Sequence, residues 1–554
     1  MPVMAARPAA GRGRLVAGLA VLLFVWVWLF RFAPLGGAFG GFDNDHFLHF
    51  SYAKQVEAGA QPLRDFLDAG LQGARPSLTY EFSAAAQRAL GDTLRSEALL
   101  TVTGVALASV ATFLAAAKLA PWPWALGTAL LAALASPKLY SYPKVLALSV
   151  IVLLIVTYAR RPSRHVLVAM SIWTAVAFLF RHDYAVYCGI GTAAVIAATH
   201  WRASRTMTRR LAAFVLLAGL LLVPSLVWIQ RYAGLVEYVR NGLEMSRSED
   251  ERTRRKEWPH PVLTSPVTAA ALLDREENIN AWLYYLFLAL PVTAGAMALV
   301  LARAGEEPQR AVATLAVALV AVVVWRTFLR GNLGARFGEM APLVAVLGAW
   351  LGGVATRGGG WTSPGRLASA ALAAVVVVMT TACIWVQQSV ASELRTGRLL
   401  SHPAALVERL GRVSAELKGL PAALRGTQGA DMMAAAYLNQ CTQPADRTLF
   451  VTYAPEVVGF SDRRFAGGRA TVIRGFYKDP LYSRRTLAWL AAESVPVALV
   501  DKAARSPALS SVPILDEFLR QHYDDVGELG VWRVLVRRDR AATGTWAGGL
   551  PCFA

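Results

Sequence analysis

Long runs of apolar residues recur along the first 390 or so positions of the chain, separated by polar segments. A helix needs about 20 apolar residues to cross the roughly 30 Å hydrocarbon core of a bilayer. By this criterion the pattern predicts eleven membrane-spanning helices, at residues 15–33, 98–117, 122–137, 143–159, 166–180, 184–199, 211–229, 281–302, 311–325, 339–356 and 367–387. The first could instead be a cleaved signal peptide, although its apolar stretch is longer than usual for one.

The basic residues between these spans predict their orientation. Lys and Arg concentrate in every second connection, as at Lys118, at 160–164 and at 202–210. Because cytoplasmic loops carry such an excess, the pattern predicts a cytoplasmic N-terminus. Three segments then face the extracytoplasmic side, and we expect the chemistry there: residues 35–97, 230–280 and 389–554.

Composition excludes several classes of protein. The 554 residues include 56 Lys and Arg against 37 Asp and Glu, a formal charge of +19, yet only 17% of the chain is charged and 55% is hydrophobic. A soluble domain carries about 25% charged residues, and a disordered chain is far less hydrophobic. Since the basic residues lie mainly beside apolar runs, we expect no nucleic-acid partner. Four cysteines without paired C-x-x-C spacing exclude a zinc module and a disulfide scaffold.

The C-terminal part of the chain changes in character. Short β-rich runs alternate with helical segments there, with strands predicted at 448–453, 470–475, 495–501 and 531–538 and helices near 483–493 and 513–523. Such alternation indicates a small α/β domain. The predicted fold is therefore a polytopic α-helical membrane domain, residues 1–388, followed by a small extracytoplasmic α/β domain, residues 389–554. Cys441 and Cys552 could pair in an oxidising compartment or remain free.

The first outside loop places two carboxylates next to the membrane. Asp43 and Asp45 (GFDNDHFLHF) precede a predicted helix whose Leu48, Tyr52 and Val56 share one apolar face, suited to lying on the bilayer surface. General-base catalysis on a hydroxyl needs a carboxylate fixed within hydrogen-bond reach, and an anchored helix supplies that fixation. The alternative is that one of the polar residues here only caps the helix. Since one cap needs one residue, we expect at least one of the two acids to be catalytic.

Charged residues at the outside end of the fifth span need a separate explanation. Arg181, His182 and Asp183 follow one another at the edge of the bilayer, where ionisable side chains usually have a partner or a function. We predict that Asp183 assists the general base or orients a metal ion or the acceptor, meaning the substrate that carries the reacting hydroxyl. We also predict that Arg181 binds phosphate and that His182 lies near the acceptor. The alternative is an Arg181–Asp183 ion pair that only ends the helix.

Three arginines depart from the positive-inside pattern. Arg326, Arg330 and Arg336 lie in a connection predicted to be extracytoplasmic. Guanidinium groups bind phosphate oxygens in a planar, bidentate manner and stabilise the charge on a leaving phosphate. We therefore predict that this cluster binds the phosphate of a donor, meaning a substrate from which that phosphate leaves. Snorkelling to lipid head groups is the alternative, and Glu339 could instead pair with one of the three.

These features together resemble the GT-C-type glycosyltransferases, bacterial members included, which are integral membrane enzymes that transfer a sugar from a polyprenyl-phosphate donor on the extracytoplasmic side. The resemblance rests on Asp45 eight positions before Ala53-Lys54, the AGAQPLRDF turn at 58–66, the segment RPSLTYEFSAAAQRALG at 75–91 and the predicted topology. It covers the first 120 residues best. Where family members often have Asp followed by Glu, this chain has Asp45-His46, which makes Asp43 the nearer second acid.

The resemblance implies an inverting reaction with Asp as general base and a polyprenyl-phosphate-linked sugar as donor. The acceptor would be a hydroxyl of a cell-envelope glycan such as lipopolysaccharide, of a lipid or of a protein. It also implies a location in the bacterial inner membrane. A multi-span transporter or lipid flippase is the rival interpretation, but matching inverted repeats with Gly- or Pro-broken helices are not evident in the sequence.

The remaining candidates lie in the first outside loop. His46, Arg64, Arg75 and Tyr80 are predicted to shape the acceptor cleft, although Arg64 could instead form a turn-stabilising pair with Asp65. The sequence requires no cofactor. A divalent cation such as Mg²⁺, Mn²⁺ or Ca²⁺ stays open, because carboxylates near phosphate can hold one but no complete ligand set is recognisable.

Overall fold

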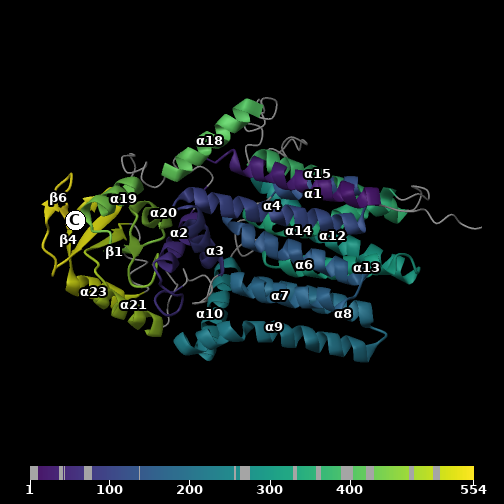
Figure 1. The fold of residues 1–554 in the computed structure, drawn as a ribbon, viewed down its shortest axis with the longest axis horizontal. Helices are drawn as coiled ribbons and strands as arrows, with labels where there is room; N and C mark the ends of the chain where they lie inside the picture. The colour runs from purple at the N-terminus through teal and green to yellow at the C-terminus, as the bar shows by residue number, and fades with distance from the viewer. Residues whose placement is uncertain are drawn as a thin grey trace, which may run out of the picture. The chain divides into compact units, whose positions relative to one another are not determined.

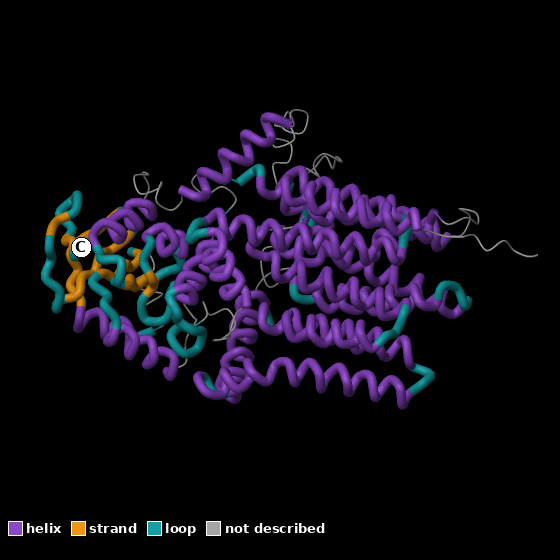
Figure 2. The backbone as a smooth tube through the Cα atoms, in the orientation of Figure 1, coloured by secondary structure: helices purple, strands orange, loops and turns teal. Residues whose placement is uncertain are grey.

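The computed structural model describes residues 10–35, 42, 44–67, 78–135, 138–254, 258–262, 275–328, 333–356, 364–387, 403–419, 430–472, 480–502 and 512–554. The chain divides into two compact units. The first, here called the helix bundle, comprises residues 1–33, 101–223 and 253–407, and the second, here called the sheet unit, comprises residues 34–100, 224–252 and 408–554. The strands drawn in Figure 2 all belong to the sheet unit.

The helix bundle is built from long apolar helices (Figure 1). They are α1 (Ala10–Phe32), α4 (Leu94–Leu119), α5 (Trp122–Leu134), α6 (Tyr142–Arg160), α7 (Arg164–Phe180), α8 (His182–His200), α9 (Ser204–Tyr232), α12 (Glu276–Arg303), α13 (Pro308–Trp325), α14 (Leu333–Thr356) and α15 (Pro364–Gln387). The first turns of α4 and the last turns of α9 belong to the sheet unit. Helices α12 and α13, α7 and α8, and α5 and α14 pack directly against one another.

Each predicted span falls on one of these helices. In the described part of the chain, seven helices are long and apolar enough to cross a membrane: Gly13–Phe32, Leu94–Leu119, Leu139–Arg160, Ser204–Tyr232, Glu276–Arg303, Pro308–Trp325 and Arg336–Thr356. Three shorter apolar helices accompany them, at Trp122–Leu134, Arg164–Phe180 and Ala370–Ala382. The span predicted at 184–199 falls on α8, whose first turn carries Asp183. The protein is thus a mostly helical, polytopic membrane protein, while the number of eleven spans and their orientation stay predictions.

Glycines allow helices of the bundle to approach closely. A Cβ atom at Gly191 in α8 would lie 2.7 Å from Cδ1 of Ile155 and 2.8 Å from Cγ2 of Val320. A Cβ atom at Gly352 in α14 would lie 2.6 Å from Cε3 of Trp124. Small residues at such crossings permit van der Waals contact between backbones, the main source of helix association in a bilayer.

The sheet unit combines helices with short strands. Its helices, wholly or largely, are α2 (Asn44–Glu57), α3 (Leu78–Leu90), α10 (Leu235–Arg254), α18 (Pro403–Gly419), α19 (Ala430–Cys441), α20 (Pro455–Ser461), α21 (Pro480–Ala492) and α23 (Pro513–His522). Its strands are β1 (Arg447–Val451), β2 (Arg464–Phe465), β3 (Val497–Asp501), β4 (Tyr523–Leu529), β5 (Trp532–Arg537), β6 (Gly544–Thr545) and β7 (Pro551–Cys552).

Five of the strands form a mixed sheet in the order β2-β1-β3-β5-β4. Strand β1 is parallel to β2 and β3, whereas β5 is antiparallel to β3 and β4. Strands β1 and β3, in the interior of the sheet, are buried along nearly their whole length. A strand buried on both faces reads as a continuous apolar run, which explains why both could be predicted from sequence. The core on one face contains Leu449, Val451, Ala498 and Val500 together with Leu490 of α21.

Most of the predicted C-terminal elements are present, with one error, and several short elements were not predicted. Strands β1, β3 and β5 and helices α21 and α23 fall where strands and helices were predicted. The strand predicted at 470–475 is wrong over residues 470–472, which form no strand, and its remainder lies outside the described residues. Strand β4 was not predicted, because its sequence YDDVGEL is polar and mostly exposed at the edge of the sheet. The predicted domain boundary near residue 388 also lies outside the described residues.

The apolar face of α2 is buried in protein, which corrects the prediction that it lies on the bilayer surface. Leu48, Tyr52 and Val56 are at most 4% exposed. The ring of Tyr52 stacks on that of Tyr80 in α3 at 4.8 Å between centroids and lies 4.8 Å from the ring of Phe465 in β2. The i, i+4, i+8 spacing therefore indicated a buried face correctly. What covers it is the C-terminal part of the chain together with α3.

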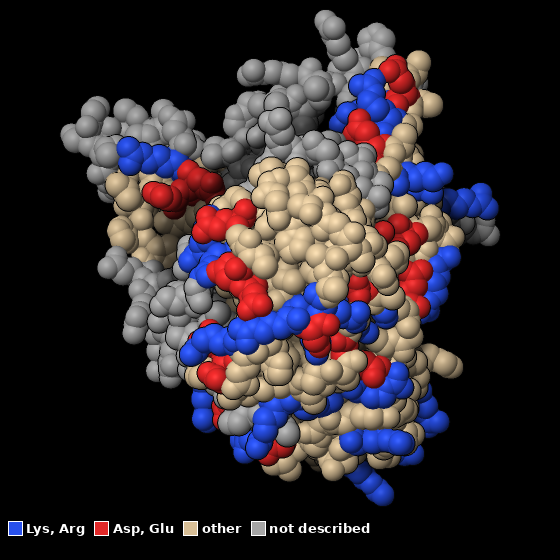
Figure 3. Space-filling model, turned by 90° about the vertical axis from the view of Figure 1, so that its left-hand side faces the viewer, with Lys and Arg blue, Asp and Glu red and all other residues tan. Residues whose placement is uncertain are grey.

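Charged side chains of both signs are exposed on the sheet unit. Figure 3 shows basic and acidic side chains interspersed between uncharged areas on this side of the molecule. Pairs across or beside the β4–β5 hairpin include Arg538 with Asp524, at 2.8 Å, and Lys502 with Glu528. Both signs mixed at the surface are typical of a face exposed to water. This part of the protein thus differs from the helix bundle, whose outer helices expose Leu and Val side chains.

A disulfide joins Cys441 at the end of α19 to Cys552 in β7, across 111 residues of sequence. In the chain-entropy account, a cross-link that closes a loop of this length stabilises a protein by restricting its unfolded state. We expect the double variant Cys441→Ser, Cys552→Ser to lower the free energy of unfolding of the sheet unit by about 2–5 kcal/mol. Thermal unfolding of the full-length protein with and without a reductant measures this. Reductant should leave the double variant unchanged, and detection of both thiols as free in the denatured, unreduced wild type would contradict the prediction.

Candidate functional site

Asp45 lies in the first turn of α2, inside the helix and not at its cap position. One of its carboxylate oxygens, Oδ1, accepts a hydrogen bond from the hydroxyl of Tyr453. Tyr453 comes just after strand β1, so a residue 408 positions away in sequence orients this acid. The side chain of Asp45 remains partly exposed, as a proton acceptor must be. Asp43, the second predicted acid, lies outside the described residues.

His46 and Tyr80, two candidates for the acceptor cleft, are buried in the sheet unit. His46 is 0% exposed, and its ring lies edge-on to that of Phe42 at 4.7 Å. Tyr80 is 4% exposed and lies between Tyr52 and His49, at 4.8 and 5.8 Å between ring centroids. Both side chains thus contribute to the packing of α2 and its neighbours, and their predicted role toward an acceptor stays a prediction.

The turn after α2 is stabilised by an ion pair between Arg64 and Asp65, which the sequence suggested as the alternative to a role of Arg64 in the acceptor cleft. Arg64 Nη2 lies 2.7 Å from Oδ2 of Asp65, and the backbone N–H of Gln61 donates to the same oxygen at 2.7 Å. Partial burial opposes ionisation of Asp65, but the hydrogen bonds from Arg64 and Gln61 outweigh it and hold the pKa of the carboxyl below its ordinary value. Arg75, another candidate, lies outside the described residues.

Asp65→Asn should destabilise this turn in a pH-dependent way. Because the folded-state pKa is lowered, the carboxylate contributes stability above its unfolded pKa, and that contribution is lost as the pH falls through the folded-state pKa. The thermal stability of the variant should therefore lie below that of the wild type at neutral pH, and the two should converge in acid. Arg64→Gln should reproduce part of the loss. Parallel pH profiles for wild type and Asp65→Asn would contradict this account.

A second group of predicted residues lies in the helix bundle, at the junction of α7 and α8. Arg181 interrupts the two helices and binds Asp183 in a bidentate manner, with Nε 2.9 Å from Oδ1 and Nη2 3.0 Å from Oδ2. Asp183 Oδ1 also accepts from the N–H of Tyr184 at 3.1 Å. The ion pair that the sequence left as an alternative is therefore present. The adjacent His182 packs against the ring of Phe178 at 4.4 Å between centroids.

Glu339 connects this junction to two other helices. Its Oε1 accepts from Nζ of Lys144 in α6 at 2.7 Å, and its Oε2 accepts from the hydroxyl of Tyr184 in α8 at 2.8 Å. Arg336, one turn earlier in α14, reaches the same carboxylate at 3.2 Å. The side chains of Glu339 and Lys144 are only 8% and 14% exposed. Pairing of Arg336 with Glu339, raised from the sequence, is thus observed, and Lys144 is an additional partner.

These residues form one partly buried cluster that contains more cations than carboxylates. We call it the cationic cluster, and its members are Lys144, Arg181, Asp183, Tyr184, Arg336 and Glu339. The guanidinium of Arg181 lies over the ring of Tyr184, 5.8 Å from its centre, and Tyr184 in turn donates to Glu339. Among the described residues of the cluster, three cations face two carboxylates, an arrangement suited to attracting an anion.

The structure sorts the predicted site residues into two groups, one in each unit. Arg181, Asp183 and Arg336 meet in the helix bundle, and Asp45, with the packed residues below it, belongs to the sheet unit. Arg326 is exposed at the end of α13, and Arg330 lies outside the described residues. Among the described residues, no group of three or more His, Cys, Asp or Glu side chains is arranged to hold a metal ion.

Three residues of these groups were missed from the sequence. Lys144 was read as part of an apolar span, although a lysine at the end of a span that is predicted to be extracytoplasmic is a signal of the same kind as Arg336. Tyr184 was overlooked because tyrosine is common at membrane interfaces. Tyr453 ends a run that was predicted as a strand, and residues that follow parallel strands often line functional sites.

Comparisons with known proteins found similarity only among solved structures. No family model and no curated protein matches the chain. The chain is similar to ArnT from Cupriavidus metallidurans, crystallised with undecaprenyl phosphate, with 15% identity over 95% of this chain and 98% of that chain and a TM-score of 0.47. It is also similar to the archaeal oligosaccharyltransferase AglB from Archaeoglobus fulgidus, in complex with an inhibitory peptide and a dolichol-phosphate, with 12% identity over 97% of this chain and 76% of that chain and a TM-score of 0.43. Both similarities extend over at least 95% of this chain.

Proposed function

We propose that the protein is a membrane glycosyltransferase that moves a sugar from a polyprenyl-phosphate-linked donor to a hydroxyl of a cell-envelope glycan, a lipid or a protein. The observation that supports this most directly is the cationic cluster. Its guanidinium and ammonium groups can bind the oxygens of a phosphate diester. The helices that carry them are apolar enough to accommodate the prenyl chain.

The cationic cluster supplies the part of the reaction that concerns the leaving group. As the bond between the anomeric carbon and the phosphate oxygen breaks, negative charge grows on the phosphate. Preorganised cations stabilise this charge more in the transition state than in the bound donor. Arg181, Arg336 and Lys144 take this role, joined by the predicted arginines Arg326 and Arg330.

Asp45 supplies the part that concerns the acceptor. Its carboxylate takes the proton of the acceptor hydroxyl while the oxygen attacks the anomeric carbon from the side opposite to the phosphate, which inverts the configuration there. The hydrogen bond from Tyr453 fixes one carboxylate oxygen and so aims the other. Asp43 or Asp183 assists as the second acid, and a divalent cation stays open as a helper.

The proposed orientation follows the positive-inside pattern. The N-terminus lies in the cytoplasm, and the reaction takes place on the extracytoplasmic side of the bacterial inner membrane. The ends of α6, α8 and α14 that carry the cationic cluster are all on that side in the predicted topology. Reporter fusions after residue 390 should then be active only outside the cytoplasm.

The experiment that tests the function uses purified protein in liposomes with a labelled polyprenyl-phosphate sugar. A transferase should release free polyprenyl phosphate and glycosylated acceptor in equal amounts. A transporter or flippase should instead move intact donor between leaflets, with no cleavage of the sugar–phosphate bond. Intact donor throughout, with a panel of envelope glycan, lipid and peptide acceptors, would refute the proposal.

A further inference from the structure

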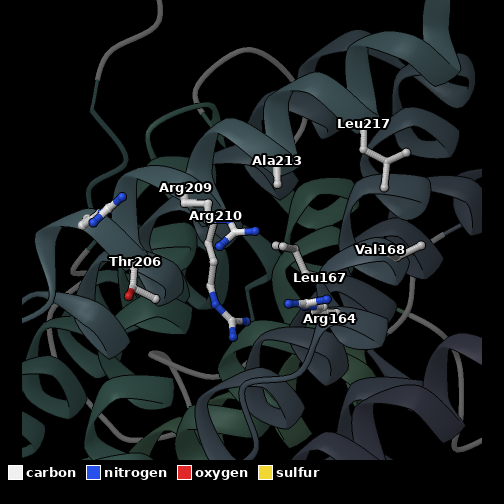
Figure 4. A pocket seen from close by; sticks show the side chains of 9 residues that line it. Arg164, Leu167, Val168, Thr206, Arg209, Arg210, Ala213 and Leu217 are labelled. Carbon is white, nitrogen blue, oxygen red and sulfur yellow. The ribbon is translucent and has the colours of Figure 1, made fainter.

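Helices α7 and α9 line a basic pocket that includes Arg164 at the start of α7, at the opposite end of that helix from Arg181. The pocket has a volume of about 520 Å³ and is lined by Arg164, Leu167 and Val168 of α7 and by Arg205, Thr206, Arg209, Arg210, Ala213 and Leu217 of α9 (Figure 4). Cavities of roughly 300–1,000 Å³ are the size range of small-molecule sites. Both helix starts lie at the end of the bundle that the positive-inside pattern predicts to be cytoplasmic.

Four arginines surround this pocket without a carboxylate to balance them. Its lining contains no acidic residue, and within the described segments none of the four arginines is ion-paired with Asp or Glu. The positive-inside rule accounts for arginines in a cytoplasmic connection. It does not account for their arrangement around one hollow, since like charges at short range repel one another.

One of the arginines is held in place by a buried tyrosine. Arg210 Nη1 donates to the hydroxyl of Tyr158 at 3.1 Å, and its guanidinium lies 5.7 Å from the centre of that ring. The Tyr158 oxygen is in turn 3.1 Å from Nε2 of His200 at the end of α8, and Tyr158 is 0% exposed. A snorkelling arginine would extend freely into the head groups. Arg210 is instead fixed at the wall of the pocket by residues of two other helices.

The other wall of the pocket is apolar and continues onto the lipid-facing side of α9. Along this helix Arg210, Ala213 and Leu217 follow one another at spacings of three and four residues, which puts them in one row (Figure 4). The neighbouring Leu216 and Leu220 are 74% and 64% exposed, as expected of side chains that contact acyl chains. The cavity thus joins a cluster of cations to a surface suited to hydrocarbon.

We infer that this pocket binds an anionic phospholipid, with the phosphate of its head group held by Arg164, Arg209 and Arg210 and an acyl chain lying along Ala213 and Leu217. A phosphate diester satisfies guanidinium groups in bidentate geometry, and basic pockets between membrane helices on the cytoplasmic side are suited to anionic head groups. A free phosphate ion would use the arginines but would leave the apolar row without a partner. This inference does not depend on the proposed transferase activity.

The test compares lipid retention by the full-length protein and two pairs of variants. Protein is extracted from nanodiscs that contain phosphatidylglycerol and phosphatidylcholine in equal amounts, and the retained lipids are counted by native mass spectrometry. The variant Arg164→Gln, Arg209→Gln removes two pocket cations whose side chains are exposed, so the fold should persist. The matched control Arg202→Gln, Arg303→Gln removes two basic residues from the same predicted side but outside the pocket lining. A further variant, Ala213→Trp, fills the hollow while keeping all arginines.

The expected outcomes separate the possibilities clearly. Wild type and control should retain phosphatidylglycerol in preference to phosphatidylcholine, and the pocket variant should lose this preference by about tenfold or more, as for the loss of two charge-assisted hydrogen bonds. Ala213→Trp should lose it as well. Equal retention by the wild type and both pocket variants would overturn the inference. So would displacement of the lipid by inorganic phosphate alone, which would identify the pocket as a site for a free anion.

Discussion

Asp45→Asn should lower the turnover of sugar transfer by about two to four orders of magnitude, the range that a positioned general base contributes. Asparagine has the shape of aspartate and can still accept the hydrogen bond from Tyr453 through its side-chain oxygen. It cannot take a proton. Geometry is therefore preserved while the proposed chemical role is removed, and binding of the donor should stay close to that of the wild type.

The control for Asp45 is Asp92→Asn, another acid of the sheet unit, which lies 3.4 Å from Lys54 of α2 and is partly exposed. It should keep nearly full turnover. Asp43→Asn, assayed separately, assigns the role of the second acid. The measurement is the initial rate of transfer from a polyprenyl-phosphate sugar in liposomes. Full turnover of both the Asp45 and the Asp43 variants would show that the proposed base is wrong.

Charge changes in the cationic cluster should move donor affinity in opposite directions. Lys144→Gln and Arg336→Gln each remove a positive charge, and each should weaken binding of polyprenyl phosphate by about tenfold to a hundredfold, since a charge-assisted hydrogen bond contributes about 1.5–3 kcal/mol. Glu339→Gln removes a negative charge and raises the excess of cations over carboxylates. It should bind polyprenyl phosphate at least as tightly as the wild type does.

The unfolding temperatures of Lys144→Gln, Arg336→Gln and Glu339→Gln should not follow their affinities for polyprenyl phosphate. Glu339 is 6% exposed and is shared by Lys144, Arg336 and Tyr184. Removing one partner of a buried ion pair typically costs about 3–5 kcal/mol, because the other charge is left unpaired. All three variants should therefore lower the unfolding temperature, whereas the effects on affinity differ in sign.

Both quantities can be measured on one preparation, by titrating polyprenyl phosphate into the detergent-solubilised protein and by following thermal unfolding without ligand. Arg231→Gln is the matched control, because Arg231 is an exposed basic residue near the end of α9 with no part in the cationic cluster. It should change neither quantity. A fall in affinity of equal size for Lys144→Gln and Glu339→Gln would show that the cluster is a structural network that binds no phosphate.

Helices could be predicted from the sequence because membrane spans depend on a local property. A run of apolar residues long enough to cross the bilayer identifies a helix without knowledge of its neighbours, and every predicted span falls on one. The strands β1 and β3 were found for a similar reason. Strand β4 escaped prediction because a polar edge strand has no distinctive pattern of its own.

Partners could not be predicted, because they depend on contacts between distant segments. The row formed by Leu48, Tyr52 and Val56 indicated a buried face, but nothing local shows that Phe465 covers it. The sequence likewise singled out Asp45 without Tyr453, which is 408 residues away. Ion pairs between residues close in sequence, such as Arg336 with Glu339 one helix turn apart, could be anticipated.

The link between Cys441 and Cys552 constrains the order in which the protein can mature. Cys552 is synthesised 111 residues after Cys441 and lies in the β6–β7 hairpin. The N–H of the next residue, Phe553, donates to the carbonyl of Cys441 at 2.7 Å. The bond cannot close until translation has passed residue 552 and that stretch has met an oxidant. Closure of this disulfide therefore follows the synthesis of every described helix of the bundle, all of which end before residue 388.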